Sequence, residues 1–179
     1  MDNKIGIILG STREGRASEA VGNWVLKHSK EFRDTTFEIV DIKDYNLPFL
    51  GTTDKIENID RWNQKLAELD GFIFVVAEYN HSITGVLKNA LDLARDAWNN
   101  KSAGIVSYGS AGGARAAEHL RGILAELQIA SVKGHVLLSL FEDFENFSTF
   151  KPRDIHNGNL ELLFTQVNDW ATALKTLRK

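Results

Sequence analysis

Short, nearly continuous apolar runs alternate along this chain with longer segments in which apolar residues recur every three or four positions. The apolar runs are rich in Ile, Val, Leu and Phe, a pattern typical of strands that are buried on both faces of a parallel sheet. The strand with the most apolar sequence is GFIFVVAEY. The runs predict strands over residues 4–10, 36–42, 71–79, 103–110 and 134–140.

The remaining segments carry apolar stripes at helical spacing and predict five helices. Because each connection between strands is long enough for a right-handed βαβ unit, we expect a parallel sheet in a three-layer α/β fold. Residues 1–179 contain neither an internal repeat nor a low-complexity linker, which predicts a single domain. The stripes are Val21, Trp24, Val25, His28 and Phe32; Trp62, Leu66 and Leu69; Leu87, Ala90, Leu91 and Ala94; Ala116, Leu120, Ile123, Leu124 and Leu127; and Leu160, Leu163, Phe164, Val167, Trp170, Leu174 and Leu177.

One long segment, FEDFENFSTFKPRDIHNG at 141–158, shows no regular periodicity. Irregular loops of this length are uncommon in compact domains unless they cover a site or make a contact. Aromatic residues are frequent at protein interfaces. We therefore expect five aromatic residues to anchor contacts between subunits, and a monomer in sedimentation analysis would contradict this. They are Trp98, Phe141, Phe144, Phe147 and Phe150.

Composition narrows the class of protein. The chain has 179 residues, a formal net charge of -3 and no cysteine, which excludes disulfides, thiolate metal sites and a cysteine nucleophile. The slightly acidic balance gives no support for nucleic-acid binding. The start MDNKIGIILG lacks the pattern of a signal peptide, and no apolar stretch approaches the roughly 20 residues that span a bilayer. These features predict a cytoplasmic protein that does not attach to membranes.

Metal and serine-hydrolase sites have little support in the sequence. The five histidines lack the spacing of metal ligands, and no GxSxG motif is present. His81 either contacts a substrate or faces solvent, and Arg115 either pairs with an acidic neighbour or contacts the phosphate of a nicotinamide cofactor. Both choices remain open from the sequence.

The segment ILGSTREGRAS at 8–18 follows the first predicted strand and nearly matches an ATP-binding P-loop. Gly10 and Gly15 have the P-loop spacing. Arg16 stands where the loop needs lysine, however, and Ala17 replaces the hydroxyl that binds Mg²⁺. A triphosphate site with a metal is therefore disfavoured, and the dinucleotide motif GxGxxG is absent as well.

This loop is better suited to a single phosphate without a metal. The hydroxyls of Ser11, Thr12 and Ser18 are potential donors to phosphate oxygens, and the first backbone amides of the next helix point the same way. Arg13 or Arg16 would add positive charge. The structural alternative is that Ser18 only caps the helix and the arginines are solvated.

Two further loops follow predicted strand ends, at 77–85 and 108–115. Ligands of open α/β sheets bind beyond the carboxyl ends of the strands, so these loops and residues 10–18 are expected to meet in one site. A flavin ring needs an aromatic or glycine surface and amide donors around its edge. Each loop alone is more typical of ordinary turns, and only the three together favour a flavin.

In these three segments the chain resembles the NADPH-dependent FMN reductase family of flavodoxin-like oxidoreductases. The resemblance rests on GSTREGRAS, on EYNHSITGVLKNALD at 78–92 and on SYGSAGGARAAEHLRGIL at 107–124, in the expected order. It implies a five-stranded parallel sheet of order 2-1-3-4-5, noncovalent FMN, NAD(P)H as electron donor, and homodimers or homotetramers with the flavin near the subunit interface.

The resemblance also implies positions for FMN contacts. Ala77 and Thr84 depart from the family pattern, because prolines usually stand at or near both places; this puts the path of the loop in doubt more than its ligand. The implied contacts are Ser11, Arg13 and Ser18, with Thr12 and Arg16 nearby, for the phosphate; Glu78, Tyr79, Asn80 and Ser82 for the ribityl chain and ring; and Ser110, Gly112 and Gly113 for the pyrimidine edge.

The function implied is an FMN-dependent NAD(P)H oxidoreductase that passes hydride to FMN and then to a small-molecule acceptor: a quinone, an azo compound, a metal oxyanion or free flavin. No protein acid or base is obligatory, so no catalytic residue is assigned. Two alternatives remain: an FMN-binding electron carrier without its own NAD(P)H site, and an apo scaffold or nucleotide-binding regulator. The near balance of 24 acidic and 21 basic residues weighs toward the reductase, since flavodoxin carriers tend to be strongly acidic.

Overall fold

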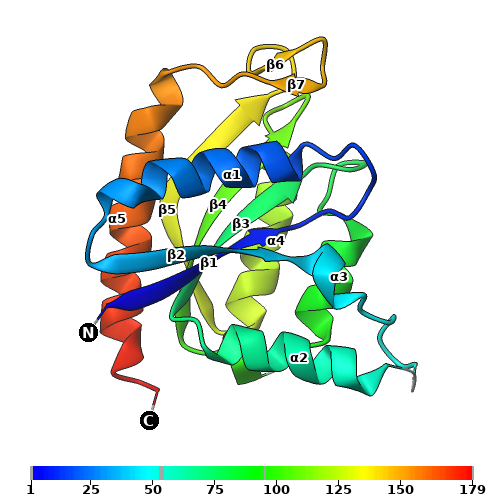
Figure 1. Ribbon diagram of the computed structural model, residues 1–179, viewed down its shortest axis with the longest axis vertical. Coiled ribbons are helices and arrows are strands. Elements are labelled where there is room, and N and C mark those ends of the chain that lie inside the picture. Colours follow the sequence, from blue (N-terminus) through cyan, green and yellow to red (C-terminus); the bar gives the residue numbers. More distant parts are fainter. Residues whose placement is uncertain (1, 53–54, 95, 179) are drawn as a thin grey trace.

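The computed structural model describes residues 2–52, 55–94 and 96–178, in which a parallel five-stranded sheet lies between layers of helices (Figure 1). The strand order is β2-β1-β3-β4-β5, and every neighbouring pair is parallel. This order confirms the predicted flavodoxin-like fold. The strands are β1 (Asn3–Leu9), β2 (Thr35–Asp41), β3 (Gly71–Ala77), β4 (Lys101–Gly109) and β5 (Ile129–Ser139).

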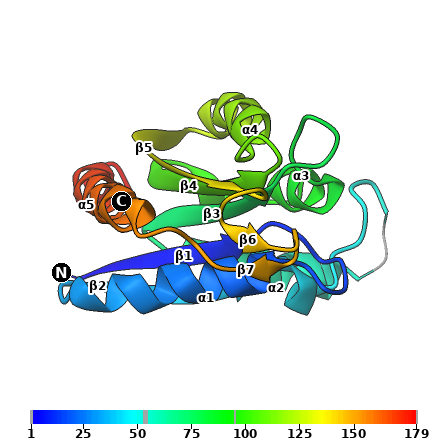
Figure 2. The same ribbon diagram turned by 90° about the horizontal axis from the view of Figure 1, so that it is seen from above.

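The helices divide between the two faces of the sheet. Buried side chains of α1 and α5 form one hydrophobic core with the strands, and those of α2, α3 and α4 form the other. Figure 2 shows α1 and α4 on opposite sides of the sheet. The bounds are α1 (Ser18–His28), α2 (Ile56–Ala67), α3 (Gly85–Asp92), α4 (Ala114–Glu126) and α5 (Ile155–Lys175).

The central strands have continuous apolar sequences because both of their faces are buried. In β1, Ile7 points to the core of α1 and α5, whereas Ile8 points to the opposite core. In β3, Val75 and Phe74 divide in the same way. Successive side chains of a strand alternate between faces, so a strand with helices on both sides needs an apolar residue at every position.

The structure corrects two of the predicted segments. Strand β5 begins at Ile129 rather than at residue 134. Ile129 and Val132 are buried, but Ser131 and Lys133 interrupt the continuous apolar run on which the prediction rests. The segment 141–158 is not irregular: it contains an antiparallel hairpin of β6 (Phe144–Glu145) and β7 (Thr149–Phe150), followed by the first turn of α5. Strands of two residues are too short to leave a periodic signal.

The expectation that Trp98 anchors a subunit interface is wrong. Its side chain is fully buried, its Nε1 donates to the carbonyl oxygen of Leu91 at 3.1 Å, and its ring lies 4.8 Å from that of Phe72. Phe144 is also buried, whereas Phe141 and Phe147 are exposed. Trp98 therefore belongs to the core between the sheet and α2 and α3.

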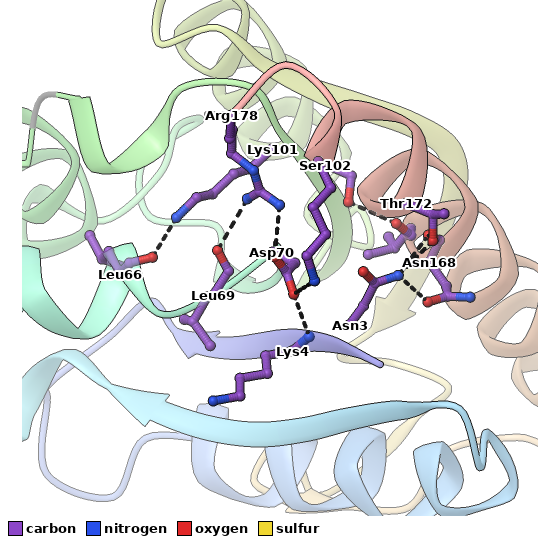
Figure 3. A network of polar contacts seen from close by, with 12 residues as sticks. Asn3, Lys4, Leu66, Leu69, Asp70, Lys101, Ser102, Asn168, Thr172 and Arg178 are labelled. Atoms are coloured by element: carbon purple, nitrogen blue, oxygen red, sulfur yellow. Dashed lines mark hydrogen bonds and ion pairs between the residues drawn. The ribbon is translucent and has the colours of Figure 1, made fainter. Parts of the chain in front are cut away.

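A polar network closes the amino-terminal edge of the sheet (Figure 3). The carboxylate of Asp70, just before β3, pairs with Lys175 at 2.8 Å and with Arg178 at 2.7 Å. Beside it, Lys101 donates to the carbonyl oxygen of Leu66 at 2.6 Å, and burial together with the charge of Arg178 lowers the pKa of Lys101 to about 8. The network ties the end of α5 to β3 and β4, and it lies at the opposite edge from the three predicted site loops.

Candidate functional site

The loops after β1 and β3, together with the carboxyl end of β4, border one cavity of about 360 Å³ at the carboxyl edge of the sheet. Ser110, Gly112 and Gly113, which follow β4, are not among the residues that line it. Arg13 and Gly15 line it from the loop after β1, Tyr79 from the loop after β3, and Gly109 from the end of β4. Phe147 closes it from the β6–β7 hairpin. The three loops therefore meet, as their positions at parallel strand ends predict.

A larger hollow of about 750 Å³ lies elsewhere, beside α2 and the end of α3. Leu50, Ile59 and Leu93 contribute apolar surface to it. It includes no residue of the three site loops. Its size alone does not make it the functional site, because ligands of open α/β sheets bind beyond the carboxyl ends of the strands, where the smaller cavity lies.

Arg16 lies beneath the loop after β1 instead of on the wall of the cavity. Its guanidinium donates to both carboxylate oxygens of Asp41 and to Glu19, with 2.7 Å between Arg16 Nη2 and Glu19 Oε1. It also donates to the carbonyl oxygen of Ser11. The side chain of Arg16 is 3% exposed. The alternative that the arginines are merely solvated is therefore wrong for Arg16, which joins the loop to the end of β2.

The hydroxyls of the loop are buried and paired with each other. Ser11 Oγ donates to Ser18 Oγ at 2.9 Å and lies 3.5 Å from the phenol oxygen of Tyr108. The alternative that Ser18 caps α1 is wrong, since Ser18 is already the first helical residue and no side chain caps this end. Thr12 is partly buried, whereas Arg13 is exposed and donates to the phenol oxygen of Tyr79 at 3.3 Å.

Thr84 occupies the place near which the family usually has proline, and it connects two of the loops. Its hydroxyl accepts a hydrogen bond from the amide of Leu87 at 3.1 Å, which caps α3, and donates to the carbonyl oxygen of Gly10 at 2.5 Å. A side chain at Gly10 would bring its Cβ within 2.8 Å of the carbonyl oxygen of Val75. The missing proline is thus replaced by a helix cap that fixes the first loop to the second.

A tight turn follows β3. Tyr79 and Ser82 exchange two backbone hydrogen bonds, of 3.0 and 3.1 Å, around Asn80 and His81, whose φ angles are 48° and 75°. Positive φ at both central residues is the pattern of a type I′ turn. The ring of Tyr79 therefore stands at the cavity, while Asn80 and His81 are exposed. Ser82 Oγ lies 2.9 Å from Nδ1 of His119, so it is engaged with α4.

Glu78 fastens the second loop to the third. Its carboxylate pairs with the guanidinium of Arg115 and accepts the backbone amides of Arg115 and Ala116 at 3.2 and 3.4 Å. Burial alone would raise the pKa of Glu78, but the hydrogen bond from Arg115 and these amides hold it below its ordinary value. Of the two roles open to Arg115 from the sequence, the structure shows the pairing with an acidic neighbour. Glu78 remains ionised, and its carboxylate holds the two loops together.

Glycines shape the third loop. Gly112 and Gly113 have φ angles of 66° and 74°, and a Cβ at Gly113 would lie 2.7 Å from the amide nitrogen of Tyr108. Only a residue without a side chain reaches this conformation so close to the backbone of β4 without strain. Gly112 and Gly113 are buried, whereas Ser110 is exposed beside them.

A partly buried histidine supports this loop from β5. His135 Nε2 lies 2.9 Å from Ser107 Oγ, whose hydroxyl donates to the carbonyl oxygen of Gly112 at 2.7 Å. Burial, with a smaller effect of the positive charge of Arg121, lowers the pKa of His135 to about 4. His135 is therefore neutral near pH 7 and donates from Nε2 to the serine.

This depressed pKa predicts a loss of stability in mild acid. Because the ordinary pKa of about 6.5 applies to the unfolded chain, the unfolded state takes up a proton on His135 first, and stability is lost as pH falls toward the folded pKa. Between pH 7 and pH 5 we expect a loss on the order of 2 kcal/mol from this group. Urea denaturation at the two pH values measures it. His135→Gln should show a smaller loss, and equal losses in the two proteins would contradict the assignment.

Sequence reasoning missed part of the cavity wall. Tyr108, Leu140, Phe147 and Ser148 all line it. Tyr108 lies near the end of β4, directly before the loop, where the sequence pattern does not distinguish a wall residue from a core residue. Phe147 and Ser148 carry no motif in the sequence, because a hairpin from beyond the fifth strand brings them to the site.

The residues present fit flavin mononucleotide. Arg13 offers an exposed guanidinium, and a Cβ at Gly15 would meet open space, so ligand atoms have access to the backbone there. Tyr79 and Tyr108 supply aromatic surface, and Leu140 supplies apolar surface. One cationic end and one aromatic part in the same cavity match a molecule with a phosphate arm and a flat ring.

In the described ranges, no helix has the length and apolar character needed to cross a membrane. The same part of the chain contains no group of three or more His, Asp or Glu side chains placed to bind a metal ion.

The strand order and the cavity define the class of the protein: a flavodoxin-like protein with a site suited to flavin mononucleotide. Residues 3–143 match the NADPH-dependent FMN reductase family, and the chain belongs to this family. The protein is an oxidoreductase with FMN as cofactor and NAD(P)H as electron donor.

Named relatives agree with the family. The chain is 35% identical over 135 residues to an NAD(P)H-dependent FMN reductase of Schizosaccharomyces pombe, covering 70% of this chain and 68% of the relative. It is 33% identical over 158 residues to an NAD(P)H:quinone oxidoreductase of Solanum tuberosum, covering 82% and 80%. The fold is similar to that of FerB, a flavoenzyme NAD(P)H:(acceptor) oxidoreductase from Paracoccus denitrificans, with a TM-score of 0.76 at 18% identity over 96% and 98% of the chains.

Proposed function

We propose that this protein reduces quinones with electrons from NAD(P)H, using FMN bound in the cavity bordered by the loops after β1 and β3 and by the end of β4. The observation that carries the proposal is this cavity, in which an exposed arginine and two tyrosines lie together. A quinone acceptor is favoured by the similarity to the NAD(P)H:quinone oxidoreductase of Solanum tuberosum. Azo compounds, metal oxyanions and free flavin are the competing acceptors.

The first loop binds the cofactor phosphate in this proposal. Arg13 donates to phosphate oxygens, and the amides around Gly15 and the start of α1 add donors. Ser11 and Ser18 contribute by rotating their paired hydroxyls toward the ligand, and Thr12 adds a third hydroxyl. Arg16 acts differently, because its pairing with Asp41 and Glu19 leaves it holding the loop in shape.

The second and third loops orient the ring. Tyr79 supplies a stacking surface, and Asn80 supplies an amide group beside it. Ser110 and the amides next to Gly112 and Gly113 face the polar edge of the ring. Glu78 and Ser82 act indirectly, since Arg115 and His119 already engage their side chains.

Bound FMN supplies the hydride chemistry that links the nicotinamide to the acceptor. The chain itself binds the phosphate of the cofactor and leaves one face of the ring open, where NAD(P)H and then the acceptor bind in turn. The residues that line the cavity exclude water. No side chain of the cavity is assigned as a proton donor, because Glu78 remains ionised in its pairing with Arg115.

Two optical measurements test the proposal. Purified protein reconstituted with FMN should show flavin absorption, and NADPH added without oxygen should bleach it within minutes. Adding a benzoquinone should then restore the colour. Absence of FMN binding would overturn the proposal. A stable yellow protein that NADPH does not bleach would favour the electron-carrier alternative.

The phosphate assignment gives a specific prediction. Arg13→Ala should raise the Kd for FMN by about 10- to 100-fold, because a charge-assisted hydrogen bond contributes about 1.5 to 3 kcal/mol. The fold should survive, since Arg13 is exposed. Arg33→Ala is the matched control: this exposed arginine precedes β2 at the opposite edge of the sheet. Unchanged FMN affinity in Arg13→Ala would count against the assignment.

A cytoplasmic location, a single domain and a homodimeric or homotetrameric assembly remain predictions from the sequence and the resemblance. Sedimentation velocity of the FMN-loaded protein tests the assembly. Of the aromatic residues expected at an interface, Phe141 and Phe147 keep the exposure that such a role needs.

A further inference from the structure

The four phenylalanines between β5 and α5 divide into an inner pair packed on the core, of which Phe144 is buried and Phe150 partly buried, and an exposed pair. Phe144 and Phe150 face each other across the β6–β7 hairpin with ring centroids 5.1 Å apart, and Phe150 packs on Trp24 of α1 at 5.6 Å. Phe141 and Phe147 are 67% and 64% exposed, and their rings meet edge to face at 5.5 Å. The first pair fastens the hairpin to the core, whereas the second pair adds little buried surface.

A buried carboxylate fixes the base of this hairpin. Asp143 is fully buried and accepts the amide of Ser139 at 2.8 Å, the amide and Nε of Arg153 at 3.1 Å each, and Nε2 of His156 at 2.9 Å. Burial alone would raise the pKa of Asp143, but the hydrogen bonds from Arg153 and Ser139 hold it below its ordinary value. The hairpin therefore projects from a rigid support.

The tip of the hairpin holds Phe147 in an unfavourable backbone conformation. Asn146 and Phe147 have φ angles of 50° and 57°, and the amide of Ser148 donates to the carbonyl oxygen of Glu145 at 3.1 Å. This is the pattern of a type I′ turn, in which glycine is preferred at the second central position. A bulky residue at positive φ is rare and strained, and such strain concentrates at functional sites. The contact with Phe141 leaves Phe147 64% exposed, so packing within the folded state gives little reason to place phenylalanine there.

The position of the ring supplies a reason. Phe147 and Ser148 line the cavity together with Arg13 and Gly15. Figure 2 shows the hairpin above the start of α1, next to the loop after β1. An apolar wall beside Arg13 excludes water, and charge-assisted hydrogen bonds are stronger where water is excluded.

We infer that Phe147 is a flavin-binding residue, which the turn presents to the cofactor beside Arg13 and which slows release of the noncovalent FMN. This inference rests on the proposed function, because it takes the cavity to be the flavin site. It assigns the strain at Phe147 to ligand retention: the backbone conformation costs stability in the apoprotein, and contact with the bound cofactor compensates for that cost.

Three variants separate ligand contact from turn strain. Phe147→Gly removes the ring and relieves the strain, Phe147→Tyr keeps a ring under the same strain, and Asn146→Gly changes the neighbouring turn residue without removing the ring. The measurements are the Kd for FMN by quenching of flavin fluorescence and the thermal midpoint of the apoprotein.

We expect Phe147→Gly to raise the Kd for FMN by about tenfold while the midpoint of the apoprotein stays the same or rises by about 2 °C. Phe147→Tyr should keep the Kd within about twofold of the wild-type value. Asn146→Gly should do the same, because the cavity wall is intact.

The outcomes distinguish this inference from the proposed function. If the wild-type protein binds no FMN, both are overturned. If it binds FMN and is bleached by NADPH, and Phe147→Gly has the same Kd, only this inference is overturned. A shift of Phe147→Gly to smaller species in sedimentation velocity with unchanged FMN affinity would also overturn it, and would assign the exposed rings to contacts between copies of the chain.

Discussion

Replacing Arg16 with methionine should lower the free energy of unfolding by about 3 kcal/mol or more and weaken FMN binding by about tenfold or more. The guanidinium is buried and donates to Asp41, Glu19 and the carbonyl oxygen of Ser11. Its removal leaves the Asp41 carboxylate without its cation and releases the loop that contains Arg13. Urea denaturation of the apoprotein and FMN titration measure the two effects separately.

The partners of Arg16 provide the controls for this experiment. Glu19→Gln removes an ion pair whose acidic partner is largely exposed, so it should cost less than about 1 kcal/mol. Combining Arg16→Met with Asp41→Leu removes both buried charges and should recover part of the stability, but not the FMN affinity. An Arg16→Met protein as stable as the wild type would show that the pairing with Asp41 does not support the fold.

Gly113→Ala should be the most damaging exchange of a glycine for alanine in the site loops, with a loss of about 3 kcal/mol. The expected loss combines the cost of a side chain at positive φ with the cost of overpacking. At Gly113, φ is 74° and the added Cβ would lie 2.7 Å from the amide nitrogen of Tyr108 and 2.8 Å from Cβ of Ser107. Both atoms have little room to move, because one is a backbone atom of β4 and the other is attached directly to that backbone.

Gly122→Ala in α4 is the matched control for that exchange. The residue lies within the same helix that Gly113 precedes, and a Cβ there meets nothing within 4 Å. Alanine should therefore stabilise the protein by about 0.5 to 1 kcal/mol through its higher helix propensity. The thermal midpoint should fall in Gly113→Ala and rise in Gly122→Ala. That result would confirm that loop geometry, and not the loss of glycine as such, causes the effect. A small loss at Gly113 would mean that the third loop relaxes easily.

The arginines of the first loop illustrate how far residue types predict a site. By residue type alone, Arg13 and Arg16 are equivalent candidates for a phosphate contact in the segment ILGSTREGRAS, and only the family resemblance favours Arg13. In the structure Arg13 is exposed at the cavity, whereas Arg16 is buried against Asp41. The physical reason is a carboxylate at the end of β2, 25 residues away in the sequence, which the residue types of the loop do not reveal.

Thr84 and Glu78 show the same dependence on distant partners. As a departure from the family pattern, Thr84 indicates only a lost proline, yet it caps α3 and binds the carbonyl oxygen of Gly10 across 74 positions. Glu78 matches a flavin-loop position, but its carboxylate is used by Arg115. The spacing of a motif predicts where a loop lies. Which group each side chain contacts depends on how the loops pack against one another in the folded protein.

The sequence by itself determined the layers of this protein, because strands buried on both faces must be apolar throughout and amphipathic helices must cover them. It also determined that three loops share one edge, since parallel strands end on the same side. Only the tertiary structure decided which side chains reach the cavity, and it added Phe147 through a hairpin whose two-residue strands leave no periodic signal. The physical reason is that a burial pattern depends on residues close together in the sequence, whereas ion pairs and cavity walls form between residues that are far apart in it.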